Sequence, residues 1–462
     1  EALVAEGYVS SGFRLREVDL QAGSATYELI EGRLVDVLVR GDGVADGARG
    51  IGELDPAYVA ARLAPEPGAF DVDATQEALR VLLRDRNIER VDAAIRPGAA
   101  PGEAVLDVDA TARRPYDFAF TFANDTPAEI GEATGRVAFA ARNIAAAGDE
   151  LRGEAELTEG RRRIVAEFET PTRPGGPAPF VAVEAARSEF VSGPLSDPID
   201  ARSDFLRFAA GVRLPLIETS RRSLTTVVAF DWKRTKSFAG GIGVTFGSGS
   251  EGGVTRTSVL SLGQEFVDLG EDRTIAIRAT ANLGLPILGA TPNTAENPSG
   301  QDGEFFSFIA QAQAAQRLTP EVTLIARAQG QLASEALLPV EQVAIGGRET
   351  VRGFPEAAAN GDDALVGSLE GRIAAFDLPV PDLTPAGHDA TFVLTPFVDA
   401  GVVRRREGGG SDTLVGVGGG FIWSPRPGLS ARFFFGAPLT DRRGARGLQG
   451  EGAHFAVTLA LP

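Results

Sequence analysis

The chain of 462 residues contains no cysteine and only two histidines, His388 and His454. Without cysteine it can form neither a disulfide framework nor a thiolate metal site, and two distant histidines exclude a histidine cluster. Any catalytic pair would have to come from serine with lysine or from carboxylates, and the sequence singles out none. We therefore expect no enzymatic activity, no metal and no cofactor.

Positive charge is also scarce. The chain has 45 lysines and arginines against 63 aspartates and glutamates, a formal net charge of -18. Because binding to a phosphate backbone needs a concentrated positive face, we expect no nucleic-acid partner. The glycine-rich run GSGSEGG at 247–253 lacks the Lys-Ser/Thr and the helix of a phosphate-binding loop, so it predicts a hairpin tip. Methionine is absent as well, and the sequence offers no reason for it.

Long apolar runs are missing too. No uncharged apolar run approaches the ~20 residues that a membrane-spanning helix needs. A transmembrane barrel remains possible, because each of its strands needs only ~9–11 residues with one apolar face. The chain begins with Glu1 and shows no basic-then-apolar leader, so we expect a mature or trimmed chain.

The first 113 residues mix helical and strand patterns. Residues 1–45 give a helical segment over 1–9 and three short alternating segments, which together make half of an α+β module. Residues 46–113 give a complete unit, with helices around Pro56–Leu63 and after a capping Asp73, and strands over 88–95 and 103–111. The run RPGAAPGE between these strands predicts a tight turn. A generic α+β adaptor domain is the alternative.

From residue 114 onward, short strand-like runs alternate between apolar and polar residues. In Thr274–Leu285, for example, Ile275 and Ile277 fall on one face and Arg278 on the other, and Arg327 lies on the polar face of Val322–Leu332. A soluble sandwich would also alternate, but at least fifteen such runs without a helix favour a closed membrane barrel. We expect fifteen to seventeen strands, with 240–247 as the doubtful one. Tyrosine and tryptophan are so rare here that the aromatic girdle has to be weak or built from phenylalanine.

The tetrapeptide Val351-Arg352-Gly353-Phe354 lies in the run IGGRETVRGFPE, whose glycines predict a shaped loop. In the following strands, alternation places Asp399 on the lumen-facing side, opposite Val398 and Ala400. Glu370, Arg372, Arg278 and Arg327 are predicted to face the lumen by the same count. Pro396 removes one ladder hydrogen bond, so we expect a bulge or a strand end there.

These motifs carry a family resemblance. IGGRETVRGFPE, Gly361-Asp362, GSLEGR, FVDAG, VGVGGGF and FGAPL occur in this order and resemble the closing third of two-partner-secretion transporters, whose superfamily also includes barrel-assembly proteins. The run EGRLVDVLVRGD and the RPGAAPGE turn are similar to the first and second polypeptide-transport-associated (POTRA) modules of that family. Pro462 departs from the family, whose last strand normally ends on an aromatic residue.

The resemblance implies a transmembrane antiparallel β-barrel of about sixteen strands, preceded by small α+β POTRA modules. It places a partial first module at 1–45, a second at 46–113, and a barrel at 114–462 whose loop at about 334–364 folds inward. It also implies that Arg352 pairs with Asp399 and pins the loop.

For function, the resemblance implies an outer-membrane transporter, with its POTRA modules in the periplasm. They would bind a large β-rich secreted exoprotein, unfolded in the periplasm, and the exoprotein would be exported through the barrel. The expected partners are this exoprotein and the lipid bilayer, and we expect a monomer. A barrel-insertion factor of the same superfamily and a passive porin are the alternatives.

Overall fold

The amphipathic segments at the start of the chain fold as a hairpin followed by a β-α-α-β-β module. The computed structural model describes residues 6–45, 51–63, 70–193, 195–196, 199–244, 252–293, 301–441 and 447–461. In the hairpin, β1 (Gly12–Asp19) pairs with β2 (Ser24–Ile30). In the module, β3 (Arg33–Arg40) runs parallel to β5 (Glu103–Ala112), and β4 (Ile88–Pro97) runs antiparallel to β5. The helices α2 (Pro56–Leu63) and α3 (Val72–Leu82) connect β3 to β4.

The module has its own apolar core, in which Leu54, Val59 and Leu82 from the helical side pack on Leu106 and Val108 of β5. Both predicted helices are present, and the first has the predicted bounds. The predicted cap of the second helix was wrong. Asp71, in an extended conformation, caps α3 by accepting hydrogen bonds from the backbone N of Asp73 (2.8 Å) and Ala74 (3.2 Å), so Asp73 already belongs to the first turn.

The pairing of β3 with β5 differs from the predicted division at residue 45. Val37 and Val39 of β3 pack against the core of the module, so the β-α-α-β-β unit runs from Arg33 to Ala112. The alternation of β3 predicted a strand correctly but could not show its partner, which lies about seventy residues later in the chain (Arg33 opposite Glu103). Of the helical segment predicted at 1–9, residues 1–5 lie outside the described residues, and Gly7 lies in a turn.

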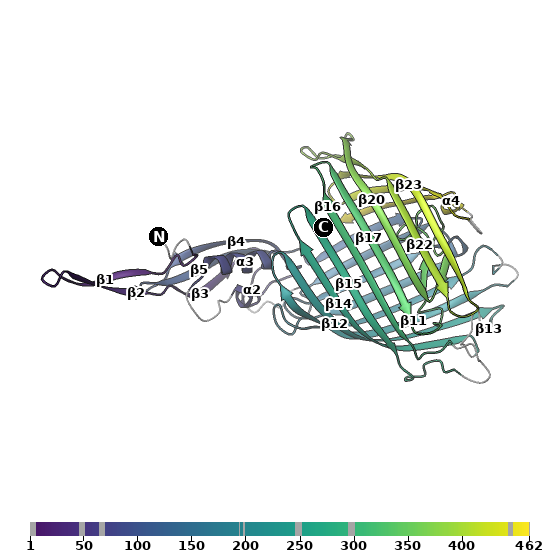
Figure 1. Ribbon diagram of the computed structural model, residues 1–462, viewed down its shortest axis with the longest axis horizontal. Helices are drawn as coiled ribbons and strands as arrows, with labels where there is room; N and C mark the ends of the chain where they lie inside the picture. The colour runs from purple at the N-terminus through teal and green to yellow at the C-terminus, as the bar shows by residue number, and fades with distance from the viewer. Residues whose placement is uncertain are drawn as a thin grey trace.

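The rest of the chain closes into one antiparallel barrel, shown with the module at one of its ends in Figure 1. Its strands are β6 (Tyr116–Ala123), β7 (Thr134–Arg142), β8 (Glu150–Leu157), β9 (Arg161–Glu169), β10 (Ala178–Glu189), β11 (Arg202–Glu218), β12 (Arg222–Ala239), β13 (Ile242–Gly243), β14 (Val254–Leu269), β15 (Arg273–Gly284), β16 (Phe306–Arg317), β17 (Val322–Ala333), β20 (Asp363–Asp377), β21 (Thr391–Leu394), β22 (Phe397–Arg405), β23 (Gly410–Arg426), β24 (Leu429–Pro438) and β25 (Ala453–Leu461). The first and last of them, β6 and β25, pair and close the barrel.

These eighteen segments occupy sixteen positions. The short β13 pairs only with the end of β12 and extends its hairpin, so the described part of the doubtful run at 240–247, residues 240–244, forms no separate barrel strand. The predicted tip at 247–253 lies mostly outside the described residues, since 247–251 are among those left out. The segments β21 and β22 both lie between β20 and β23, so they form one strand interrupted at Thr395 and Pro396, where a bulge or a strand end was expected.

The outward face of the barrel carries a belt of apolar residues and uses phenylalanine in place of tyrosine. Phe376, Phe392, Phe421 and Phe433 form a stack across neighbouring strands, with ring centroids 4.8 to 5.8 Å apart. No helix in the described part of the chain is long and apolar enough to span a membrane.

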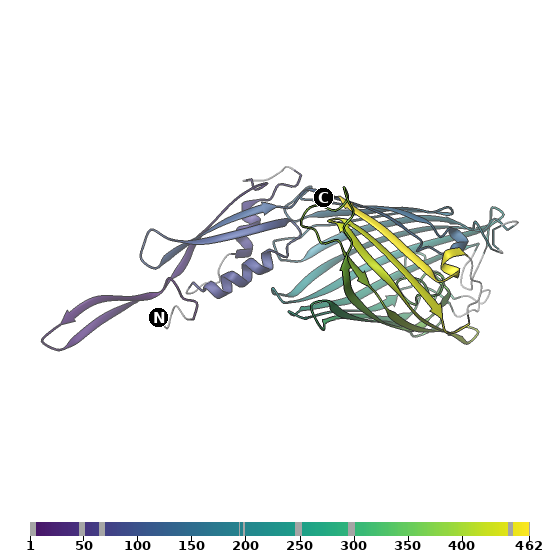
Figure 2. The same cartoon turned by 90° about the horizontal axis from the view of Figure 1, so that it is seen from above.

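The module contacts the turns at one end of the barrel, as Figure 2 shows. Glu77 of α3 accepts hydrogen bonds from the N (2.6 Å) and Oγ (2.7 Å) of Ser220, in the β11–β12 turn. Arg86 forms an ion pair of 2.7 Å with Glu150 at the start of β8. These contacts define a module end of the barrel and, opposite it, a far end.

Candidate functional site

The segment between β17 and β20, residues 334–362, folds back into the lumen from the far end of the barrel. Its base holds a small two-stranded sheet of β18 (Val343–Ile345) and β19 (Ala359–Gly361). The buried carboxylate of Asp362 accepts hydrogen bonds from the backbone N of Leu337 (2.8 Å) and of Arg406 (2.7 Å). The loop base is thus tied to the rim, and we call residues 334–362 the inner loop.

Arg352 of the inner loop lies against Asp399 of β22. Its Nε and Nη2 donate hydrogen bonds to the two carboxylate oxygens at 2.8 and 2.9 Å, and its backbone N donates to Oδ2 at 3.0 Å. Arg352 is 2% exposed and Asp399 1%. A planar guanidinium matches a carboxylate in this two-bond geometry, which an ammonium group cannot reproduce. The structure therefore brings together the two residues that the resemblance paired.

A second carboxylate completes the site. Arg352 Nη1 donates to Glu370 Oε2 at 2.5 Å, and its Nη2 donates to Ser368 Oγ at 3.2 Å. Glu370 also accepts from Arg372 Nε at 3.0 Å, and Arg327 Nη1 lies 3.8 Å away. All five N–H groups of a guanidinium can donate, so two carboxylates and a hydroxyl from neighbouring strands satisfy it well. Sequence alternation placed Glu370 in the lumen but gave no sign of this contact.

Two aromatic rings cover the charged groups. The guanidinium carbon of Arg352 lies 3.6 Å from the ring centroid of Phe397 and 5.0 Å from that of Phe434. The neighbouring Val351 and Phe354 are buried in a cluster with Val403 and other apolar residues of the wall. The pair is thus shielded from water, and cation–π attraction adds to the ion pairs.

Glycines on the wall form the surface against which the loop lies. A Cβ at Gly416 of β23 would fall 2.0 Å from the carbonyl oxygen of Arg352, and one at Gly436 of β24 would fall 2.5 Å from the backbone N of Gly353. Gly353 itself has a φ of +94°, a conformation that favours glycine. We call Gly416 and Gly436 the glycine seat. The motifs VGVGGGF and FGAPL contain these residues, but the sequence could not show what approaches them.

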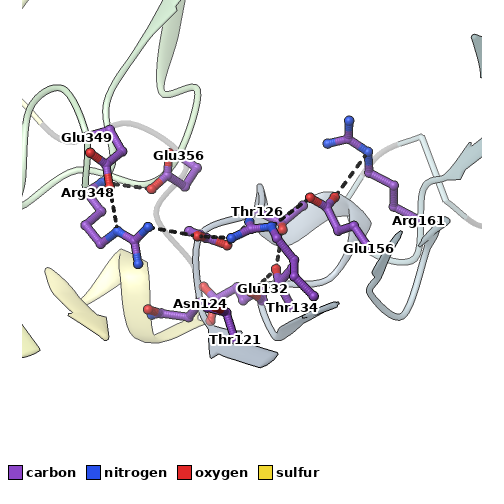
Figure 3. A network of polar contacts seen from close by, with 12 residues as sticks. Thr121, Asn124, Thr126, Glu132, Thr134, Glu156, Arg161, Arg348, Glu349 and Glu356 are labelled. Atoms are coloured by element: carbon purple, nitrogen blue, oxygen red, sulfur yellow. Dashed lines mark hydrogen bonds and ion pairs between the residues drawn. The ribbon is translucent and has the colours of Figure 1, made fainter. Parts of the chain in front are cut away.

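A polar network joins the inner loop to the strands that close the barrel (Figure 3). Arg348 of the loop pairs with Asp125, just after β6, at 3.1 Å. The backbone N of Glu356 donates to Gln449 Oε1 at 2.9 Å, and Gln449 Nε2 donates to the carbonyl oxygens of Asn124 and Thr126 at 2.9 and 2.8 Å. Gln449 lies in the short helix α4 (Gly447–Gly450), directly before β25. Its buried amide therefore contacts the inner loop and both sides of the β6–β25 pairing, a contact that the sequence did not indicate.

The remaining predicted lumen residues lie around a cavity between the loop and the wall. The cavity has a volume of about 370 Å³, and Arg278, Arg327, Glu349 and Thr350 are among its lining residues. Arg278 pairs with Glu265 at 2.5 Å, away from Arg352. The site holds a loop by ion pairs, ring contacts and close backbone packing, and no group of three or more His, Cys, Asp or Glu in the described residues could hold a metal ion.

The fold and the site define a class: an outer-membrane barrel of sixteen strands, with a β-α-α-β-β module at one end and an arginine-bearing loop inside. A family model, described as haemolysin secretion/activation protein ShlB/FhaC/HecB, matches residues 201–422. The match covers 222 of the 462 residues, just under half of the chain, and this part of the chain is similar to the two-partner-secretion transporters of that family. The protein is an outer-membrane protein with its module in the periplasm.

Among curated proteins, the outer membrane transporter CdiB of Dickeya dadantii (strain 3937) is 23% identical over 389 residues, which cover 82% of this chain and 65% of that protein. The match thus spans less than two thirds of the relative's length. Among solved structures, CdiB from Escherichia coli matches with a TM-score of 0.76 and 17% identity, over 100% of this chain and 82% of that one. BamA from Haemophilus ducreyi lacking POTRA domains 1–3 matches with a TM-score of 0.61 and 12% identity, over 98% and 90%. These structures confirm the predicted fold class.

Proposed function

We propose that this protein exports one large, β-rich exoprotein from the periplasm through its barrel, and that residues 1–112 capture this partner before export. Similarity to a secretion family supports the transport of a protein, and the chain's own features support the two steps. Residues 1–32 then form part of a first POTRA module and residues 33–112 the second. The protein acts as a monomer and without a cofactor.

The edges of the module support capture. Among the described strands, β3 and β4 each pair only with β5, so each presents one free edge of main-chain donors and acceptors. An unfolded chain can add to such an edge through main-chain hydrogen bonds, which give affinity without a fixed sequence. Glu77 and Arg86 hold this sheet against the module end of the barrel. A captured segment is therefore presented at the periplasmic opening.

The observation that carries the proposal is the buried contact of Arg352 with Asp399 and Glu370. The inner loop belongs to no strand of the barrel, and it occupies the lumen through these ion pairs, the glycine seat and a small apolar cluster. We propose that Arg352 and Asp399 form a latch that holds the loop in place until the exoprotein displaces it. A passage through the lumen then opens without any change in the number of strands.

To test this proposal, the protein is co-expressed with candidate large secreted proteins, and the amount of each candidate at the cell surface is measured. Deletion of residues 1–111 is expected to abolish export while the barrel still assembles, as judged by heat-modifiable migration on a gel. Unchanged export after the deletion would remove the capture step. A fall in the amounts of other outer-membrane barrels, with export intact, would instead support a barrel-insertion factor, which the structural similarity to BamA keeps as the second candidate.

A further inference from the structure

Six basic residues gather on the outward face of the barrel near its far end. They are Arg162 of β9, Arg187 of β10, Arg202 of β11, Arg234 and Lys236 of β12, and Arg256 of β14, and we call them the outer cationic patch. The lumen contacts of their neighbours establish which way they face. Lys233 and Thr257 both bond Glu341 of the inner loop, at 2.8 and 2.6 Å, so the alternating residues at 234, 236 and 256 face outward.

The sheet register places like charges directly opposite each other in this patch. Arg162 pairs with Arg187 across β9 and β10, and Arg234 pairs with Arg256 across β12 and β14. Like charges directly opposed on neighbouring strands are destabilising. In a chain with a formal net charge of -18, two such basic pairs on one outer surface require an explanation.

Within the part of the chain that the structure describes, only one member of the patch has a carboxylate within 4.0 Å, although the register also places Glu189 opposite Arg202 and Asp204 opposite Lys236. Arg187 lies 3.1 Å from Glu189 and 3.9 Å from Asp204. Within the described ranges, no carboxylate lies within 4.0 Å of the other five basic groups. The Nε of Arg202 is buried and has no hydrogen-bond partner.

An apolar cavity adjoins the cations on the same outer surface. Phe208, Phe230, Trp232 and Leu288 line it, and its volume is about 520 Å³. The register places Phe208 opposite Trp232. Trp232 is the outward-facing residue next to Arg234 along β12, on the side toward the module end. The indole N of Trp232 donates to the carbonyl oxygen of Leu288 at 3.2 Å, so the loop after β15 folds onto the outside of the barrel and bounds the cavity.

The patch lies at the edge of the apolar belt. Along β12, the outward positions from Leu224 to Trp232 carry no charge, and Arg222 and Arg234 flank them. The eight residue-to-residue steps from Leu224 to Trp232 extend roughly 26 Å along the strand, or about 20 Å along the membrane normal at the usual barrel tilt. This distance is close to the height of the apolar band of such barrels. The outer cationic patch is thus at the level of the headgroups of the outer leaflet.

We propose that the outer cationic patch binds the phosphate groups of a phosphorylated glycolipid of the outer leaflet, with an acyl chain in the adjoining cavity. Arginine pairs bind phosphate oxygens through two parallel hydrogen bonds, and a doubly charged anion removes the repulsion between Arg234 and Arg256. Basic clusters at a membrane interface recognise anionic headgroups in the same way. The inference rests on the outer-membrane location and is independent of the proposed export.

The test compares the wild-type protein with an Arg234→Gln/Arg256→Gln variant, and with Arg222→Gln as the control. Arg222 is an outward arginine at the other end of the same strand, and it has a partner, Asp268, at 3.5 Å. Purified protein is titrated with lipopolysaccharide carrying its lipid A phosphates and, in parallel, with enzymatically dephosphorylated lipopolysaccharide. We expect the dissociation constant to rise at least tenfold in the double variant, to stay unchanged in the control, and to rise in the wild type when the phosphates are removed.

Thermal unfolding separates binding from a structural role. Without lipid, the double variant should unfold at the same or a higher temperature than wild type, because it removes a like-charge pair. Phosphorylated lipopolysaccharide should then raise the midpoint of wild type and of Arg222→Gln more than that of the double variant. Equal affinity for both forms of the lipid, equal affinity of variant and wild type, or displacement of the lipid by millimolar inorganic phosphate would overturn the proposal.

Discussion

Replacing Arg352 by alanine is expected to free the inner loop from its place in the lumen. The side chains of Arg352 and Asp399 are 3% and 1% exposed, so the cost follows that of a buried ion pair. After the replacement, Glu370 keeps Arg372 at 3.0 Å, whereas Asp399 keeps only the backbone N of residue 352 at 3.0 Å. Leaving one buried charge without its partner costs about 3–5 kcal/mol. The free energy that holds the loop in place should fall by that amount.

The absence of cysteine from these 462 residues makes this measurable by thiol labelling. Val351→Cys places a thiol at a position that is 0% exposed while the loop is seated. Because each 1.4 kcal/mol is a factor of ten, labelling of this cysteine should become roughly 10²- to 4 × 10³-fold faster in the Arg352→Ala background. Glu349→Cys is the control, since the side chain at 349 is 77% exposed and should react rapidly in both backgrounds.

Equal labelling rates of Val351→Cys with and without Arg352 would refute the latch. Arg352→Lys should give an intermediate rate, because lysine keeps the charge and loses the two-bond geometry. The reciprocal exchange, Arg352→Asp with Asp399→Arg, should restore slow labelling only in part. The structure gives the reason: Glu370 would then lie beside an aspartate at 352.

Three further outcomes are expected. Gly416→Ala should speed the labelling of Val351→Cys, because its Cβ would fall 2.0 Å from the carbonyl oxygen of Arg352. Gly419→Ala on the same strand is the control, since its Cβ would meet nothing closer than 4.0 Å. Equal effects of the two changes would argue against the glycine seat. Gln449→Glu should lower the temperature at which the barrel loses its compact migration on a gel, because it removes two donors to the chain after β6, and an unchanged temperature would show that this amide is dispensable. Hydrogen bonds from Ser220 hold the pKa of Glu77 below its ordinary value of 4.5. The contact between module and barrel should therefore be complete above pH 4.5 and weaken as pH falls through the lowered pKa. Glu77→Gln should remove this pH dependence when the module is cross-linked to the barrel, and a pH dependence that persists would mean that another group titrates.

The barrel could be predicted from sequence because a strand that separates lipid from a polar lumen has to alternate. β15 and β17 alternate cleanly, and their bounds agree with the predicted runs to within one residue. The interruption at Pro396 could also be predicted, since proline lacks the donor that the ladder needs. Each of these features is determined by its own few residues.

Features that depend on contacts between distant parts of the chain could not be predicted from the sequence. The pairing of β3 with β5 joins residues about seventy positions apart, and alternation does not specify a partner. Glu370 was placed in the lumen by alternation, but its contact with Arg352 depends on how far the loop enters the barrel. Gln449 lies in a four-residue helix and carries no local signal. The family resemblance supplied the pairing of Arg352 with Asp399, which periodicity alone could not.

The polar contacts of the inner loop are better suited to a loop that leaves the lumen than to one that permanently fills it. Well-packed apolar residues often stabilise a buried site as well as or better than an ion pair does, so Arg352, Asp399 and Glu370 are not needed for stability alone. These residues instead restrict the inner loop to one position in the lumen. The guanidinium of Arg352 fits only where both carboxylates meet it, and the glycine seat leaves room for the loop backbone only there. A loop held in this way is either fully seated or released, because a partial shift leaves a buried charge unpaired. The polar contacts of Gln449 extend this two-state behaviour to the strands that close the barrel, so release of the loop and loosening of the β6–β25 pairing should occur together.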